Sequence, residues 1–258
     1  DDAVVQGSRP TAVVFNAVSS DNTYNNYNIG QVSITLNDND NYGVTVTPSI
    51  SINEGASQND NIRLTSQPDN DVTITLSTNS QISISPSSVT FTSLNWNVNQ
   101  QVSITATHDF IQNGNRVVDL THTATSVDTN YNGISVSNIA VTIVDIDASN
   151  VVVAETSGDT LISEAGTTDT YSIVLTTVPS DDVTINLTAN NSEVILSSSS
   201  KVFTSDNWNV PQSVTLSVVH DLISTGHRDR TISHTATSDD TTYDGISISN
   251  IIVTVQDI

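Results

Sequence analysis

Residues 91–100 read Phe-Thr-Ser-Leu-Asn-Trp-Asn-Val-Asn-Gln, and residues 203–212 repeat them almost unchanged as Phe-Thr-Ser-Asp-Asn-Trp-Asn-Val-Pro-Gln. The same offset of 112 residues separates 122–126 from 234–238, both of which read His-Thr-Ala-Thr-Ser. Self-similarity at a fixed period is typical of repeat architectures. The chain is therefore predicted to consist of tandem copies of one unit.

The repeat also defines the expected domains. Residues 1–40 align with 108–147 at an offset of 107, which makes them the second half of a repeat. We therefore expect a half repeat at 1–40, a full repeat at 41–147 and a full repeat at 148–258. The native chain is expected to continue in both directions. Because a half sandwich exposes its core, it requires completion by further chain or by a neighbouring subunit through strand addition.

Short segments in which apolar residues alternate with Ser, Thr or Asn indicate β-strands. Residues 72–76 and 214–218 are examples of this period of two. Each full repeat contains about seven such segments, separated by clusters of Asn, Asp, Gly, Ser or Pro. The prediction is an all-β fold of tandem immunoglobulin-like antiparallel β-sandwiches, arranged as an elongated array.

Composition excludes several classes of partner. The 258 residues include 28 acidic and 6 basic side chains, and the net charge of −22 disfavours binding to nucleic acid or to an anionic membrane. The chain has no cysteine, so it can form neither disulfides nor thiolate metal sites. Its apolar runs are too short for a transmembrane helix, and no membrane insertion is expected. Cations are the natural partners.

Catalytic motifs are not found in the sequence. Nothing resembles a nucleophile elbow, a phosphate-binding glycine loop or a zinc-protease helix. Paired carboxylates occur at the expected ends of strands, where turns form, and not in a recognisable cleft. The chain is therefore predicted not to be an enzyme.

Three short elements recur in the same order in the full repeats. They are Glu-Gly-Ala at 54–56 or Glu-Ala-Gly at 164–166, an Asp before a Gly-containing hairpin, and a terminal Asp-x-Asp. Together with the Trp-containing segments, they resemble Calx-beta domains and the Calx-beta-like repeats of very large bacterial surface proteins. The resemblance covers essentially the whole chain. It implies sandwiches that hold Ca²⁺ at one end through carboxylates.

The ligands implied by this resemblance lie in all three copies. They are Asp2, Asp38 and Asp40 in the half repeat, Glu54, Asp109, Asp145 and Asp147 in the middle repeat, and Glu164, Asp221 and Asp257 in the last. Calx-beta domains that bind several ions carry further Glu residues after the loop Asp, whereas this chain has none at 112–116 or 224–228. One ion per site, or none, is therefore expected.

The chemistry of the acidic positions agrees with calcium, which needs about six to eight hard oxygen ligands gathered from distant parts of a chain. The alternative is that carboxylates at strand ends only close turns. The interpretation is a structural segment of an extracellular adhesin or surface filament, stiffened by calcium at the ends of its domains and at their junctions. Its partners are neighbouring repeats and other filament subunits, with a glycan or cell-surface receptor as a further candidate.

Two sets of repeated residues admit a functional and a structural interpretation. Arg9, Arg116 and Arg228 share one equivalent position, where a structural ion pair with Asp or a hairpin cap is expected over ligand binding. Trp96 and Trp208 are suited to stack on sugars, which gives a repeated carbohydrate-binding module as the alternative function. One Trp at a fixed place in each repeat is more often an anchor in the core or at a strand edge.

The histidines and tyrosines are expected to be structural. Phe15 replaces His122 and His234 in the half repeat, and His108 aligns with Asp1, so packing is favoured over metal or acid/base chemistry. A pattern of Ser, Asp and Tyr predicts a turn closed by Asp, with Tyr packed at a sandwich corner. This pattern occurs at residues 19–24, 126–131 and 238–243.

Overall fold

The computed structural model describes residues 3–220, 223 and 225–257, and nearly all of its regular structure is β-strand, as the sequence predicts. Two compact units are formed, the first by residues 3–107 and 115–144 and the second by residues 108–114 and 145–257. Each unit contains one complete β-sandwich, and the first unit also contains a two-stranded hairpin. No helix in the described part of the chain has the length and apolarity needed to cross a bilayer.

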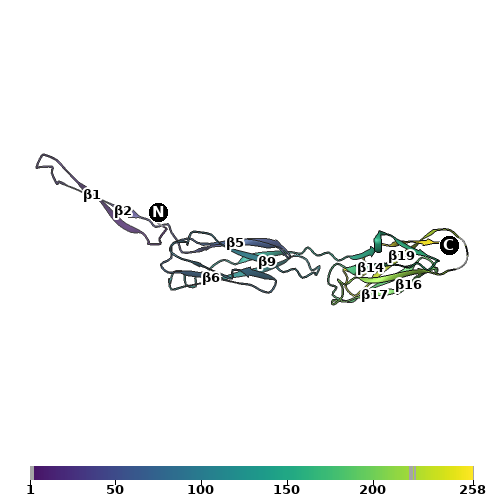
Figure 1. Ribbon diagram of the computed structural model, residues 1–258. Helices are drawn as coiled ribbons and strands as arrows, with labels where there is room; N and C mark the ends of the chain where they lie inside the picture. Colours follow the sequence, from purple (N-terminus) through teal and green to yellow (C-terminus); the bar gives the residue numbers. More distant parts are fainter. Residues whose placement is uncertain (1–2, 221–222, 224, 258) are drawn as a thin grey trace. The chain divides into compact units, whose positions relative to one another are not determined.

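The first sandwich consists of two stacked sheets. Its described strands are β3 (Val44–Thr45), β4 (Ser49–Asn53), β5 (Ser57–Leu64), β6 (Val72–Ser77), β7 (Ile82–Ser85), β8 (Ser88–Phe91), β9 (Gln100–Ala106), β10 (Arg116–Ser126) and β11 (Ile139–Val144). One sheet has the strand order β4-β11-β10-β6-β8, and the other has the order β3-β5-β9-β7. Figure 1 shows β5 and β9 in one layer and β6 in the other.

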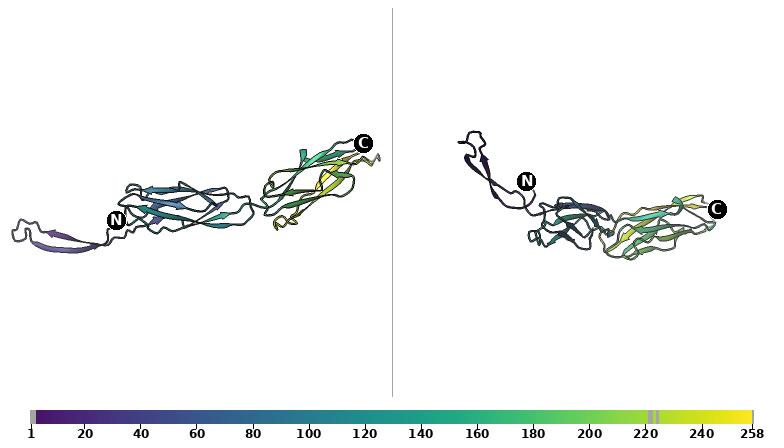
Figure 2. Two further views of the ribbon diagram at one scale, coloured as in Figure 1. Left: turned by 90° about the horizontal axis from the view of Figure 1, so that it is seen from below. Right: turned by 60° about the vertical axis from the view of Figure 1, so that its left-hand side comes forward.

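The second sandwich repeats this topology. Its described strands are β12 (Val151–Glu155), β13 (Thr160–Ser163), β14 (Asp169–Leu175), β15 (Val183–Ala189), β16 (Val194–Leu196), β17 (Ser200–Phe203), β18 (Gln212–Val218), β19 (Arg228–Thr237) and β20 (Ile251–Gln256). The sheets have the orders β13-β20-β19-β15-β17 and β12-β14-β18-β16, the same as in the first sandwich strand for strand. Figure 2 shows the two layers from further directions.

Two details differ from the predicted sandwich. Nine strands are described in each repeat where about seven were expected, partly because the first strand is divided between the two sheets as β3 and β4, or β12 and β13. Pro48 lies in the first of these breaks and has no N–H for a ladder. In addition, β4 pairs in parallel with β11, and β13 with β20. Alternation has the same period in both pairings, so it could not reveal the parallel one.

The alternating pattern builds the core of each sandwich. Ile50 and Ile52 on β4 are buried while the serines between and beside them are exposed. On β11, Ile139, Val141 and Ile143 are fully buried in the same way. Burying one such side chain contributes roughly 1.5–3 kcal/mol. The second sandwich has an equivalent core of buried Ile, Val, Leu, Phe and Tyr residues, so each repeat is stabilised by its own apolar interior.

A buried tyrosine forms the predicted corner in each sandwich. The hydroxyl of Tyr243 donates to the carbonyl oxygen of Thr177 at 2.9 Å and accepts the backbone N–H of the same residue at 3.0 Å. Tyr131 makes the same two bonds to Ser66, at 2.7 and 3.2 Å. In the turn before Tyr243, the side chain of Asp240 accepts a backbone N–H at 2.8 Å. The predicted Asp-closed turn and Tyr corner are confirmed in both complete repeats.

The half repeat contains a hairpin of β1 (Arg9–Asn16) and β2 (Asn28–Leu36). The two strands pair antiparallel and form a sheet of their own. Every residue in both strands is exposed. Figure 1 shows this hairpin as the purple two-stranded ribbon, without the second layer that the complete repeats have.

Candidate metal centre

The first aspartate of each terminal acidic motif binds the backbone of the loop before the last hairpin of its repeat. Oδ2 of Asp145 accepts the N–H groups of Asn113 and Gly114, at 2.8 and 2.6 Å. Asp257 accepts two consecutive N–H groups in the same way, the second from Gly226. We call this contact the aspartate latch.

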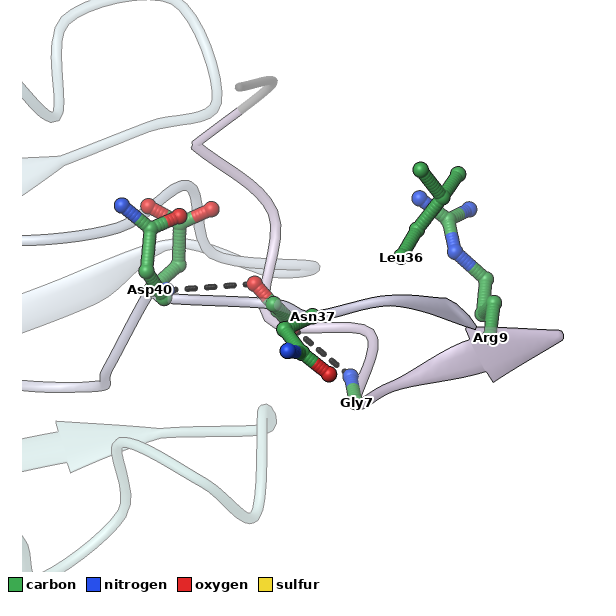
Figure 3. A pocket seen from close by; sticks show the side chains of 7 residues that line it. Gly7, Arg9, Leu36, Asn37 and Asp40 are labelled. Carbon is green, nitrogen blue, oxygen red and sulfur yellow. Dashed lines mark hydrogen bonds between the residues drawn. The ribbon is translucent and has the colours of Figure 1, made fainter. Parts of the chain in front are cut away.

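The half repeat has the same latch. Oδ2 of Asp38 accepts the N–H groups of Gln6 and Gly7, the latter at 2.7 Å, and Oδ1 accepts the N–H of Asp40 at 3.1 Å. Figure 3 shows this end of the hairpin, with Gly7 and Asp40 on either side of Asn37. These backbone donors, led by Gln6, hold the pKa of Asp38 below its ordinary value.

The backbone of the loop explains why glycine is present in every latch. Gly7, Gly114 and Gly226 have φ angles of +71°, +77° and +77°, in the left-handed region that other residues rarely adopt. This conformation lets two successive N–H groups converge on one carboxylate oxygen. The geometry supports the turn-closing interpretation of the three latch aspartates. Their assignment as calcium ligands stays a prediction.

Asp147, the second acid of its motif, has one oxygen engaged and one available. Its Oδ1 lies 2.8 Å from Nε2 of His108, and its backbone N–H donates to Oδ1 of Asp145 at 2.8 Å. Its Oδ2 is buried and has no hydrogen-bond partner among the residues that the structure describes. The His108 ring also packs on Phe110, with ring centroids 4.0 Å apart, so His108 combines the expected packing role with a contact to a carboxylate.

Asp109 belongs to the same cluster. Its Oδ1 accepts the N–H of Ile111 at 3.0 Å, and its Oδ2 accepts the side-chain amide of Asn113 at 3.1 Å. Since Asp145 binds the backbone of Asn113, two carboxylates hold one loop residue from different sides. Hydrogen bonds thus link Asp109, Asp145 and Asp147, three of the predicted ligands, through Asn113 and through the N–H of Asp147.

Glu54 follows β4 in the first sandwich and is almost completely buried. The guanidinium of Arg116, at the start of β10, donates to its carboxylate. The parallel pairing of β4 with β11 and the antiparallel pairing of β11 with β10 place these residues at the same end of the sheet. The structural ion pair expected for this arginine therefore forms, with Glu54 as a partner where an Asp was expected.

The last repeat has a larger network. Arg228 donates to Oε1 of Glu164 at 2.7 Å and also binds Glu193, whose carboxylate is shared with Arg230. Burial opposes ionisation of Glu193, but the hydrogen bonds from both arginines outweigh it and lower its pKa. Nδ1 of His220 lies 3.6 Å from Oε2 of Glu164. Here too the predicted Asp partner is replaced by Glu.

Glu193 and Arg230 did not emerge from the sequence as site residues. A signal was present, because the first repeat has Gln81 and Val118 at the equivalent positions. Two neutral residues are thus replaced by one acid and one base in the second repeat. Such a paired charge change points to an added contact between the start of β16, which Glu193 precedes, and β19, which contains Arg230. Asp2 and Asp221, two other predicted ligands, lie outside the described residues.

His234 is buried in the second sandwich, as its expected structural role requires. Its ring nitrogens lie 2.9 Å from the carbonyl oxygen of Ser249, through Nδ1, and 3.0 Å from the hydroxyl of Tyr171, through Nε2. Nδ1–H must be the donor to the carbonyl, so neutral Nε2 accepts from the tyrosine. Burial lowers the pKa of His234 below its usual 6.5, and the Ser249 carbonyl opposes this only in part.

We expect the second sandwich to lose stability as the pH falls below 6.5. The folded pKa of His234 is lowered, so the unfolded chain binds the proton more tightly and stability rises with pH in this range. The slope should reach up to about 1.4 kcal/mol per pH unit. Urea titrations between pH 7.5 and 5.5, followed by Trp208 fluorescence in a Trp96→Phe background, would measure it. His234→Phe, which copies the half repeat, should remove the slope; an unchanged slope would contradict this origin.

Trp96 and Trp208 are half-buried and pack against the cores of their sandwiches. Their backbone carbonyls accept the N–H groups of Leu64 and Leu175, at 2.9 and 3.0 Å. Each tryptophan therefore ties its loop to a neighbouring strand. This arrangement favours the anchor interpretation over the sugar-stacking alternative.

Comparison with protein-family models and with curated proteins found no match. Among solved structures, the chain is similar to a protein of unknown function from Porphyromonas gingivalis W83, with 10% identity, a TM-score of 0.31, and coverage of 83% of this chain and 99% of that one. It is also similar to the calcium binding domain CBD12 of CALX1.1, with 11% identity, a TM-score of 0.38, and coverage of 74% and 79%. A third similar structure is the E. coli chaperone DraB, with 8% identity, a TM-score of 0.31, and coverage of 82% of this chain and 98% of that one. Likenesses this distant carry no functional argument, and the Calx-beta resemblance stays a prediction.

Proposed function

We propose that this chain is a structural segment of an extracellular adhesin or surface filament, made of tandem β-sandwich repeats that bind Ca²⁺ at an acidic end. The observation that carries the proposal is the duplication of strand order and polar contacts. The aspartate latch, the Arg–Glu pair and the Tyr corner occur at equivalent places in both complete repeats. Repeats that use the same residues for the same structural contacts are typical of spacers.

The buried polar groups support a structural role over catalysis. Glu54 and Glu164 are held by arginines, and His234 is held between a carbonyl and a hydroxyl. Each of these contacts stabilises the folded repeat and orients no substrate. Under this proposal the chain is not an enzyme, and neighbouring repeats are its main partners. A glycan or cell-surface receptor would be recognised through a different surface from these buried contacts.

The residues proposed to hold calcium are Asp109, Asp145 and Asp147. The buried Oδ2 of Asp147 supports this choice, because an anionic oxygen without a hydrogen-bond partner among the described residues is satisfied by a cation. Carboxylate oxygens are also the ligands that Ca²⁺ prefers. The bound ion would offset the repulsion among three acids. Glu164 fits less well, since Arg228 already binds its carboxylate.

Calcium should stabilise the second unit. If the ion binds with a Kd of about 0.2 mM, as is common for extracellular modules, 2 mM Ca²⁺ should raise the free energy of unfolding by about 1.4 kcal/mol. Calorimetric titration and thermal melting with Ca²⁺ or with EDTA would measure this. Asp147→Asn should abolish the effect, whereas Asp206→Asn, which removes an exposed turn charge, should not. No binding heat and equal melting temperatures would remove calcium from the proposal.

A further inference from the structure

The hairpin β1–β2 exposes the side chains that complete repeats bury. Val13, Val32, Ile34 and Leu36 are 44%, 52%, 39% and 51% exposed. The residues at equivalent positions of the first sandwich, all fully buried, are Leu120, Ile139, Val141 and Ile143. An isolated two-stranded hairpin is at best marginally stable in water. This apolar face therefore requires a cover.

The hairpin already has the geometry of the complete repeats. Arg9 lies opposite Leu36 across β1 and β2, just as Arg116 lies opposite Ile143 across β10 and β11. The pair β19–β20 has the same register. The aspartate latch is also formed in the hairpin. Its exposed apolar face is therefore the inner face of a sandwich, held in the correct register for a second half.

The two complete repeats show what covers this face. β4 pairs in parallel with β11 and places Ile52 opposite Ile143, and β6 pairs antiparallel with β10 and places Ile74 opposite Ala124. In the second sandwich, β13 and β15 make the same pairings with β20 and β19. All covering strands belong to the first half of a repeat, which is residues 41–107 in the first copy. The complete repeats therefore show which strand belongs beside each edge of the hairpin.

Charge adds a further requirement for the partner. Arg9 occupies the position at which Arg116 receives Glu54 and Arg228 receives Glu164. In both cases the Glu directly follows the strand that pairs in parallel with the hairpin. A matching partner therefore carries a Glu just after its parallel strand.

We propose that the hairpin is a docking site for the first half of a repeat, a polypeptide of the type seen at residues 41–107. It adds a parallel strand beside β2, an antiparallel strand beside β1 and a covering sheet. A second copy of this chain is disfavoured, because its β4 and β6 are already paired with β11 and β10, and its β13 and β15 with β20 and β19. Two chains of charge −22 also repel each other.

The test joins a copy of residues 41–107 to residue 1 of the full chain. This restores the spacing of a complete repeat, because residue 1 aligns with residue 108. Hydrogen exchange measured in EDTA should show the amides of β1 and β2 protected at least about 100-fold more than in the unmodified chain. A second fusion with residues 148–219 should give the same result. The inference rests on the repeat part of the proposed function, and EDTA separates it from the calcium part.

The control carries Ile52→Asn and Ile74→Asn in the added copy only, which should abolish the gain in protection. The proposal is overturned if β1 and β2 stay unprotected in both fusions while β10 and β11 remain protected. It is also overturned if the control protects the hairpin equally. Protection in the unmodified chain that rises with concentration, together with a dimer mass, would identify a second copy as the occupant instead.

Discussion

Replacing Arg228 by alanine should lower the melting temperature of the second sandwich by roughly 10 °C. The carboxylate of Glu164 is 1% exposed and would lose its 2.7 Å contact with the guanidinium. Breaking a buried ion pair from one side is more damaging than removing both partners, because the remaining charge stays desolvated. Thermal melting in a Trp96→Phe background, followed by Trp208 fluorescence, would report on this sandwich alone.

Two comparisons make this prediction specific. Arg63→Ala removes an exposed arginine from β5 and should change neither sandwich appreciably. Adding Glu164→Gln to Arg228→Ala should restore part of the lost melting temperature, because the buried side chain at position 164 is then no longer charged. If Arg228→Ala melts like the parent chain, or if the added Glu164→Gln lowers stability further, the buried charge is not the cause.

The fold could be predicted because the repeat and the period-two alternation are both visible in the sequence. The offset between the copies identified equivalent residues, and the structure confirms the all-β sandwich in both complete repeats. Alternation does not specify which strands pair, so the parallel contact of β4 with β11 could not be predicted. The division of the first strand was also missed, since β3 has only two residues.

The acidic motif was visible in the sequence, but the contacts of its carboxylates were not. Asp109, Asp145 and Asp147 are linked by hydrogen bonds, but sequence alone could not show that Asp145 binds backbone N–H groups. A signal existed in the constant separation of 31 residues between the latch Gly and the latch Asp in all three copies.

The arginines show a second limit of sequence reasoning. Arg116 and Arg228 were correctly assigned to structural ion pairs, but an aspartate was expected as the partner. The observed partners, Glu54 and Glu164, are 62 and 64 residues away in sequence. They become neighbours only because β4 pairs with β11 beside β10, and β13 pairs with β20 beside β19. Alternation does not determine these pairings.

Tyr243→Phe should destabilise the second sandwich by about 2 kcal/mol. The substitution keeps the buried ring and removes only the hydroxyl, which binds both the N–H and the carbonyl oxygen of Thr177. These backbone groups are buried with Thr177, so water cannot easily replace the lost partner. Urea unfolding followed by Trp208 fluorescence would give the free energy of unfolding. Tyr131→Phe should have the same effect on the first sandwich, with Trp96 as the reporter.

Tyr24→Phe is the matched control, because Tyr24 follows the same Ser-Asp turn in the half repeat but is 61% exposed. Tyr24 lies in the hairpin and outside both sandwich cores, so removal of its hydroxyl should leave both sandwiches unchanged. The three tyrosines thus share one local sequence and differ in burial. If all three substitutions had equal effects, the turn itself would be the source of stability. A loss confined to Tyr131 and Tyr243 assigns it to the hydrogen bonds that the second half of a repeat makes with the first.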